Sequence, residues 1–131
     1  MLSDSSLDDF LHISPRLDAE GAMHRQIQTP FVLPRSRRRL TLEVVPLGEK
    51  NLLVHDAGLT AEGVADRDAL LATDAFKAFR RQWIEDGVSF DEEGRLFIVC
   101  TRGSSEVDPD MARLIEAALA FQTILMTEEA R

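Results

Sequence analysis

The stretch QIQTPFVLPRSRRRLTLEVVPLGEKNLLVHDAGLT, from Gln26 to Thr60, decides the fold of this chain. In its middle, residues 40–45 alternate between core-type and surface-type side chains, which is the period of a strand with one buried face. Residues 24–29 and 52–55 are typical of two further strands, and Pro30 ends the regular pairing of the first or marks it as an edge. We therefore predict a small antiparallel meander, covered by helices on either side.

Helical periodicity predicts the covering elements. Residues 4–13 form a short N-terminal helix that ends before Ser14-Pro15, and a loop follows it. Residues 66–86 form either one bent helix or two, and Thr73 is a good N-cap within them. Residues 108–127 form the final helix.

The middle helix carries an apolar stripe that consists of Ala75, Phe76, Phe79, Trp83 and Ile84. Because Trp83 shares this stripe, we expect its side chain to be buried between the helix and the sheet. Gly87 stands where a left-handed helix cap belongs.

A second pair of strands follows the middle helix. Residues 88–90 and 96–100 flank an acidic turn in which Gly94 supplies a positive φ. The second arm is apolar on both faces, so we place it centrally in the sheet. The expected order is α-β-β-β-α-β-β-α, an α+β fold with an antiparallel sheet of about five strands and helices packed on it.

The composition fits one globular domain. The chain has 131 residues, of which 44% are hydrophobic, and we expect a single domain at 1–131 with its N-terminal helix at 4–13 and its core at 23–127. Cys100 is the only cysteine, which excludes an internal disulfide and favours a reducing compartment. No signal-peptide pattern or membrane-spanning run is visible, so we expect a cytoplasmic protein with no membrane partner.

The charge is unevenly distributed. The net charge is −8, yet residues 35–54 hold five bases against two acids, whereas the part from His55 onward holds eight bases against sixteen acids. An acidic protein repels a phosphate backbone, so direct binding to nucleic acid is not expected.

No constellation of residues points to a cofactor or metal. His12, His24, His55 and Cys100 are scattered without paired ligand spacing, so we predict no metal site. The glycines are isolated rather than gathered in a phosphate-binding loop, and no serine has the context of a nucleophile. We predict no catalytic residue and no cofactor.

The pair His55-Asp56 stands at the end of a strand, where functional sites often lie. An aspartate before a turn usually accepts hydrogen bonds from backbone amides two residues on, with Gly58 at positive φ supplying the reversal. The alternative makes Asp56 a base or ligand, with Glu43 as its neighbour across the hairpin. The sequence alone is compatible with both roles of Asp56.

Two charged clusters are candidate binding residues. The first is an arginine loop, whose guanidinium groups suit phosphates and carboxylates: Arg35, Arg37, Arg38 and Arg39. The second is an acidic turn: Asp91, Glu92 and Glu93. Each is also typical of a solvated surface loop, and the arginine charges would then balance the acidic charge of the rest of the molecule.

Two short motifs resemble a known family. Thr29-Pro30-Phe31 after the first strand and Asp56-Ala57-Gly58-Leu59-Thr60 after the third are similar to the Thr-Pro-Phe and Asp-x-Gly-x-Thr motifs of an uncharacterised bacterial and phage domain family. The similarity runs from about Ile27 to Leu125, although His55 stands where that family's pattern has Thr. The resemblance implies the fold order and a bacterial or phage origin, and no activity.

Two classes of function follow from these observations. The first is a non-catalytic acidic protein that binds a protein partner, one version being a phage or mobile-element inhibitor of a nucleic-acid-binding defence complex. The second is a small enzyme that acts on a phosphate-bearing substrate through Asp56 and the arginine loop. The sequence also leaves a homo-oligomer open.

Overall fold

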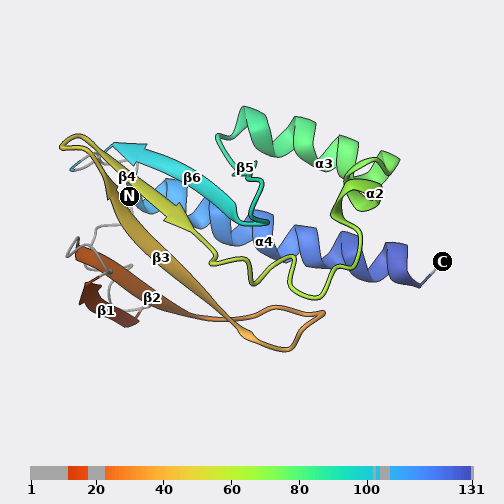
Figure 1. Ribbon diagram of the computed structural model, residues 1–131, viewed down its shortest axis with the longest axis horizontal. Coiled ribbons are helices and arrows are strands. Elements are labelled where there is room, and N and C mark those ends of the chain that lie inside the picture. Colours follow the sequence, from red (N-terminus) through yellow and green to blue (C-terminus); the bar gives the residue numbers. More distant parts are fainter. Residues whose placement is uncertain (1–11, 18–22, 102, 104–106, 131) are drawn as a thin grey trace.

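The computed structural model describes residues 12–17, 23–101, 103 and 107–130, and they form an α+β fold (Figure 1). Its strands and helices are β1 (His12–Leu17), β2 (Met23–Val32), β3 (Arg39–Leu47), β4 (Asn51–His55), α2 (Arg67–Leu71), α3 (Asp74–Glu85), β5 (Ser89–Phe90), β6 (Leu96–Thr101) and α4 (Val107–Glu129). The strands make one sheet in the order β1-β2-β3-β4-β6-β5, and every neighbouring pair is antiparallel. The predicted fold class is confirmed.

The core lies between one face of the sheet and α4. In the view of Figure 1 the sheet lies in front of the first half of α4. α3 lies above the second half of α4, next to β5. Cross-strand neighbours Val44, Val54 and Ile98 are buried on the covered face. Phe121 on α4 meets Phe76 on α3 edge to face, with ring centres 4.7 Å apart. This aromatic contact packs α3 against α4, and both rings are almost fully removed from water.

The N-terminal prediction is wrong where the structure describes it. Residues 12–17 form β1, paired along their whole length with β2, instead of the end of a helix and a loop. Pro15 lies opposite Arg25 on an edge strand, where a missing N–H is tolerated because half of the amides face away from the sheet. The rest of the helix predicted at 4–13 lies outside the described residues.

Prolines inside the meander do not end its strands. Pro30 lies within β2, where the register with β3 is irregular between Gln28 and Val32. Pro46 lies within β3, in regular register with Leu52 of β4. The Thr29 hydroxyl supplies hydrogen bonds in the irregular stretch. It donates to the Leu40 carbonyl at 2.7 Å and accepts from the Phe31 amide at 3.2 Å. Thr29 is therefore a structural residue of the bulge.

The middle helical region consists of two helices, each with its own cap. Asp66 accepts from the Ala69 amide at the start of α2, and Thr73 accepts from the Phe76 amide at the start of α3. We expected Trp83 to be buried, but its side chain is only half-buried, and Ile84 is 54% exposed. The buried stripe narrows to Phe76 and Phe79 because only this part of α3 faces Phe121.

β6 lies inside the sheet, between β4 and β5, and not at its edge. Among the described residues, the side of β6 away from β4 is paired only with the two-residue strand β5, at Leu96 and Phe97. Its residue Val99 is 47% exposed, on the face of the sheet that α4 does not cover. The final helix is longer than predicted, beginning at Val107 and ending at Glu129.

Candidate functional site

Asp56 is the most deeply engaged of the candidate residues. Its side chain is fully buried, and one carboxylate oxygen, Oδ1, accepts from the amides of Gly58 at 2.9 Å and Leu96 at 3.0 Å. The other oxygen, Oδ2, accepts from the Thr60 amide at 3.0 Å. Gly58 has φ +79°, so the predicted turn at this position is confirmed. Three amides together satisfy the carboxylate and bind the loop after β4 to the start of β6.

His55 and Glu43 are cross-strand partners on the face of the sheet opposite the core. Both are buried, and His55 Nδ1 accepts from the Ala57 amide at 3.0 Å. An Nδ1 that accepts a hydrogen bond carries no proton, so the imidazole is neutral with its proton on Nε2. This hydrogen bond also holds Ala57 at φ +56°, a conformation that side chains other than glycine rarely adopt.

Burial is the main cause of the shifted pKa of His55. It lowers the pKa below the usual 6.5, and the charge of Arg95 lowers it further, while three carboxylates oppose the shift: Glu43, Asp56 and Asp91. A histidine that stays neutral at physiological pH fits the acceptor role of Nδ1.

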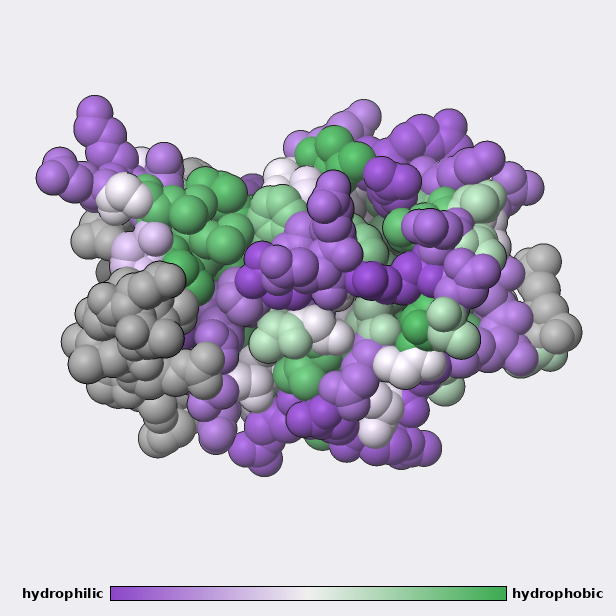
Figure 2. Space-filling model, in the orientation of Figure 1, coloured by the Kyte–Doolittle hydropathy of each residue, from purple (hydrophilic) through white to green (hydrophobic). Residues whose placement is uncertain are grey.

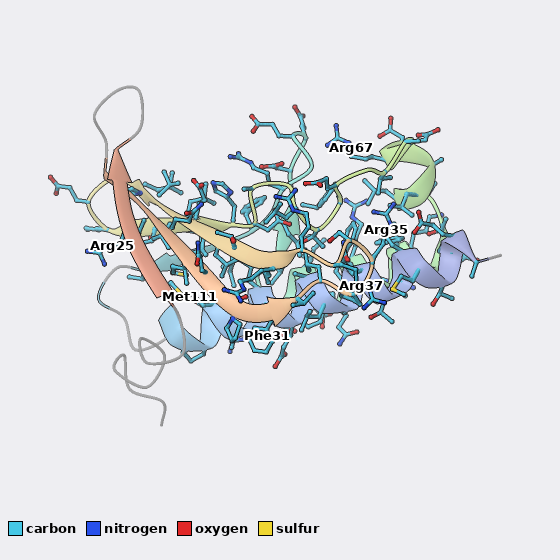
Figure 3. The ribbon with its side chains drawn as sticks, turned by 90° about the horizontal axis from the view of Figure 1, so that it is seen from below. Arg25, Phe31, Arg35, Arg37, Arg67 and Met111 are labelled. Atoms are coloured by element: carbon cyan, nitrogen blue, oxygen red, sulfur yellow. The ribbon has the colours of Figure 1, made fainter. Side chains whose placement is uncertain are left out.

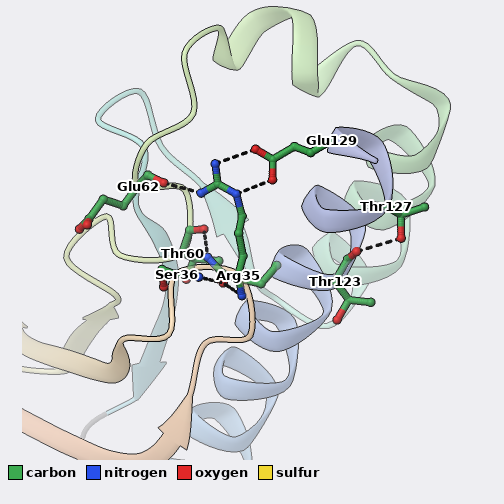
Figure 4. Close-up of polar contacts among 8 residues, drawn as sticks. Arg35, Ser36, Thr60, Glu62, Thr123, Thr127 and Glu129 are labelled. Atoms are coloured by element: carbon green, nitrogen blue, oxygen red, sulfur yellow. Dashed lines mark hydrogen bonds and ion pairs between the residues drawn. The ribbon is translucent and has the colours of Figure 1, made fainter. Parts of the chain in front are cut away.

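The arginine loop is largely bound within the molecule. Arg35 forms a fork with the Glu129 carboxylate, from Nε at 2.6 Å and from Nη2 at 2.8 Å. A third bond runs from its Nη1 to the Glu62 carbonyl at 2.7 Å (Figure 4). The hydrogen bond with Arg35 lowers the pKa of Glu129. Arg35 therefore connects the β2–β3 turn to the C-terminal turn of α4.

The other arginines are more exposed. Arg38 Nη1 binds both carboxylate oxygens of Glu62, at 2.8 and 2.6 Å. Within the described part of the chain, the exposed side chains of Arg37 and Arg39 have no ion-pair partner. Figure 3 shows Arg35 and Arg37 in the same turn at the end of the sheet. Two guanidinium groups are thus left for a partner, instead of the four counted in the sequence.

Gln122 is a buried polar residue that the sequence prediction missed. Its Oε1 accepts from the amides of Arg35 at 2.8 Å and Ser36 at 3.2 Å, and its Nε2 donates to the Thr60 carbonyl at 2.7 Å. The available signal was its position on α4, four residues after Ala118 and three before Leu125, inside the apolar stripe. A polar side chain on such a stripe needs partners from the loops that it faces.

The three carboxylates of the acidic turn differ: Asp91 is held by several hydrogen bonds, Glu93 makes one longer ion pair, and Glu92 is exposed. Asp91 accepts from the amides of Glu93 and Arg95 and pairs with Arg95 Nε at 2.8 Å. Partial burial raises the pKa of Asp91, but the hydrogen bonds and charge of Arg95 outweigh it, so the net pKa lies below the usual range. Glu93 is 3.4 Å from Arg95 Nε, and Glu92 is exposed. The hydrogen bonds of Asp91 thus shape the turn, and Glu92 and Glu93 face water.

Two hollows lie beside this turn, and Phe90 lines both. The first, between α3 and β5, has a volume of about 190 Å³ and is lined by Phe79, Arg80, Trp83, Ile84, Val88, Ser89, Phe90 and Leu96. The second, between α2 and the acidic turn, has a volume of about 280 Å³ and is lined by Arg67, Asp68, Leu71, Phe90, Asp91 and Glu92. We call the two hollows together the acidic groove. None of the residues Glu43, His55 and Asp56 lines it.

The described residues hold no group of three or more His, Cys, Asp or Glu side chains that could bind a metal ion. The Cys100 thiol is buried, and burial, together with the nearby Asp110, raises its pKa to about 12, which makes it a poor nucleophile. Among the helices of the described part, none has the length and apolar character needed to cross a membrane.

Comparison of the chain with protein-family models, with curated proteins and with solved structures finds no match. The resemblance carried by the two short motifs therefore stays a prediction. In the structure, Thr29, Asp56, Gly58 and Thr60 all belong to the bulge or the turn described above.

Proposed function

We propose that this chain is a non-catalytic protein-interaction protein that binds a basic protein partner through the acidic groove. The observation that carries the proposal is that an apolar hollow shares Phe90 with a hollow lined by the three acids Asp68, Asp91 and Glu92. Trp83 is half-buried and Ile84 is mostly exposed, and both line the groove. Apolar side chains of this kind, surrounded by charge, are typical of interaction surfaces.

The charge around the groove supports a basic partner. Residues 66–93, which include α2, α3, β5 and the acidic turn, contain eight acids and four bases. Glu92 lines the groove itself and is exposed. Complementary charge speeds the encounter of two proteins and orients them, while the apolar contacts supply much of the affinity.

The chemistry of such a partner narrows the proposal further. Proteins that bind nucleic acids expose Lys and Arg along a groove or face. An acidic protein that presents carboxylates on a rigid turn competes for that surface. An inhibitor of a nucleic-acid-binding complex is the version of this function that we propose for the chain.

The environment of Asp56 supports binding over catalysis. A general base must reach the proton that it removes, and Asp56 is fully buried with both oxygens engaged by backbone amides. The arginine loop, its proposed companion in an enzyme, has its least exposed member, Arg35, held by Glu129. Asp56 and Arg35 therefore already have structural roles.

Trp83 offers a direct test, because it is the only tryptophan and it lines the groove. An amphipathic peptide of Leu and Lys should shift the Trp83 emission on titration, whereas a peptide of equal length made of Leu and Glu should not. The affinity for the Lys peptide should fall as salt is added, since charges are screened over about 8 Å at physiological ionic strength.

Matched variants locate the contact. Reversal of Glu92 and Glu93 to Lys should weaken the binding of the Lys peptide. Glu116→Lys, at an exposed position on α4, and the pair Arg37→Ala with Arg39→Ala should leave it unchanged. Equal binding of both peptides, or turnover of a phosphoester by the wild-type chain, would refute the proposal.

A further inference from the structure

The acidic groove consists of two hollows that meet at one aromatic ring. We call the hollow between α3 and β5 the apolar hollow, and the hollow between α2 and the acidic turn the acidic hollow. Phe90 lines both. Its ring stacks on the buried ring of Phe121, with ring centres 5.6 Å apart and an angle of 23° between the planes. Because a buried neighbour holds the ring, Phe90 is a fixed divider between the hollows.

The apolar hollow has the size and the lining for one apolar side chain. Its volume is about 190 Å³, and an apolar cavity of about 150 Å³ is enough to hold a benzene molecule. Val88 and Leu96 in its lining are almost fully buried, while Ile84 is 54% exposed. Figure 2 shows small hydrophobic areas near the end of α3 among hydrophilic surface. Among the described residues of this lining only Arg80 is charged, so a second cation is repelled here.

Carboxylates dominate the acidic hollow. Asp68, Asp91 and Glu92 line it, and Arg67 is the one base in the same lining. The Arg67 guanidinium lies against Gly94, where a Cβ atom would collide with it. Asp91 is already in an ion pair, whereas Asp68 and Glu92 are exposed and form none within the described part of the chain. These two carboxylates are therefore free to bind a cation.

An apolar wall completes the acidic hollow. Leu71 and Phe90, both half-buried, supply it. The aliphatic stem of Lys or Arg packs along apolar surface of this kind while its charged end stays beside carboxylates and water. The acidic hollow thus fits one basic side chain, and it repels Asp and Glu.

We propose that the acidic groove recognises a helical segment of its partner through two neighbouring side chains, one apolar and one basic, which enter the hollows on either side of Phe90. This inference rests on the function proposed above and names the feature of the partner that is bound. On a helix, side chains at positions i and i+4 lie about 5–6 Å apart, a spacing that suits two hollows divided by one ring. Arg80 keeps the basic side chain out of the apolar hollow, so the order of the pair is fixed.

The lining of the groove favours a helix over an extended segment. An extended segment binds by adding a strand to the edge of a sheet. β5, the strand at this edge, offers only two residues for such pairing. A helix satisfies its own backbone hydrogen bonds and needs only side-chain contacts, which are what the two hollows supply.

Two neighbouring acids separate a local contact from a diffuse effect of charge. The probe is a helical peptide with Leu and Lys at positions i and i+4, and Trp83 emission follows its binding. Glu92→Gln should weaken binding by about two- to fivefold, because Glu92 lines the acidic hollow. Glu93→Gln removes the same charge one position away, outside that lining, and should weaken binding less. Equal losses would overturn the inference and leave the proposed function standing, since the charge would then act from a distance.

The apolar hollow has its own matched pair of variants. Ile84→Ala should weaken binding of the same peptide by about fivefold, because it removes part of the lining that the Leu side chain contacts. Val99→Ala, at a similarly exposed position (47%) outside the groove, should leave binding unchanged. Melting curves confirm that each variant is folded. An Ile84→Ala variant that binds like the wild type would overturn the inference.

The arrangement of the pair on the peptide is the last control. A helical peptide of the same composition, with Lys two positions after Leu, carries the two side chains on different faces of the helix. It should bind at least fivefold more weakly than the first peptide. Equal binding of the two peptides would overturn the inference alone, whereas binding of neither would overturn the proposed function as well.

Discussion

Gln122 and Thr60 lie 62 positions apart in the chain, and the Gln122 amide donates to the Thr60 carbonyl at 2.7 Å. The same side chain accepts from the amides of Arg35 and Ser36. One buried residue on α4 thus holds both the β2–β3 turn and the loop after β4 (Figure 4). These two loops carry many of the charged and motif residues of the meander. The positions of those residues therefore depend on the Gln122 side chain.

Gln122→Leu should destabilise the fold by roughly 3 kcal/mol, because it leaves backbone groups of both loops without partners in a buried place. Urea denaturation monitored by circular dichroism measures the change. Thr123→Ala, one position along on the exposed side of α4, should cost about 0.5 kcal/mol or less. Similar losses in the two variants would show that Gln122 does not connect the loops.

Asp56→Asn should destabilise the fold by about 2–4 kcal/mol, since the amide group brings a donor against the Thr60 amide that Oδ2 now accepts from. The melting temperature reports this change directly. Asp86→Asn, at an exposed position after α3, serves as the matched control and should melt near the wild type. An Asp56→Asn variant as stable as the parent would return Asp56 to the list of functional candidates.

Stability should rise with pH through the titration of His55. The folded pKa lies below 6.5, so between that pKa and 6.5 the unfolded chain binds more protons than the folded one. The stabilisation is complete above about 6.5, and it is lost as pH falls through the folded pKa. His55→Asn, which keeps an acceptor for the Ala57 amide and does not titrate, should flatten this part of the profile.

The pKa of His55 can be followed by proton NMR. Its ring signals should titrate below the usual value in the folded chain. A pKa at or above 6.5, or an identical pH profile of stability in His55→Asn, would mean that the imidazole is not held neutral by burial and by its bond to Ala57.

Phe76→Ala should cost about 3–5 kcal/mol, as expected for a fully buried aromatic side chain. Trp83→Ala should cost less, because Trp83 is only half-buried at the groove. The native Trp83 emission should accordingly lie between those of buried and exposed tryptophans. A larger loss for Trp83→Ala than for Phe76→Ala would contradict this order.

The sequence by itself determined the local elements. Alternation in residues 40–45, the caps at Thr73 and Gly87, and the glycine turns at Gly58 and Gly94 all predict structure that the fold contains. These signals are local, since they depend on side-chain periodicity and on backbone conformations that only a few residues adopt. The α+β class follows from their order alone.

The tertiary structure decided which candidate residues are occupied and which are free. Asp56 reaches Leu96, 40 positions away, and Arg35 reaches Glu129, 94 positions away, and no local pattern encodes either contact. The same holds for β1 and for the place of β6 between β4 and β5, because the pairing of a strand depends on the neighbours that the whole chain supplies. Charged residues and motifs are visible in the sequence, whereas the contacts that they make depend on long-range packing.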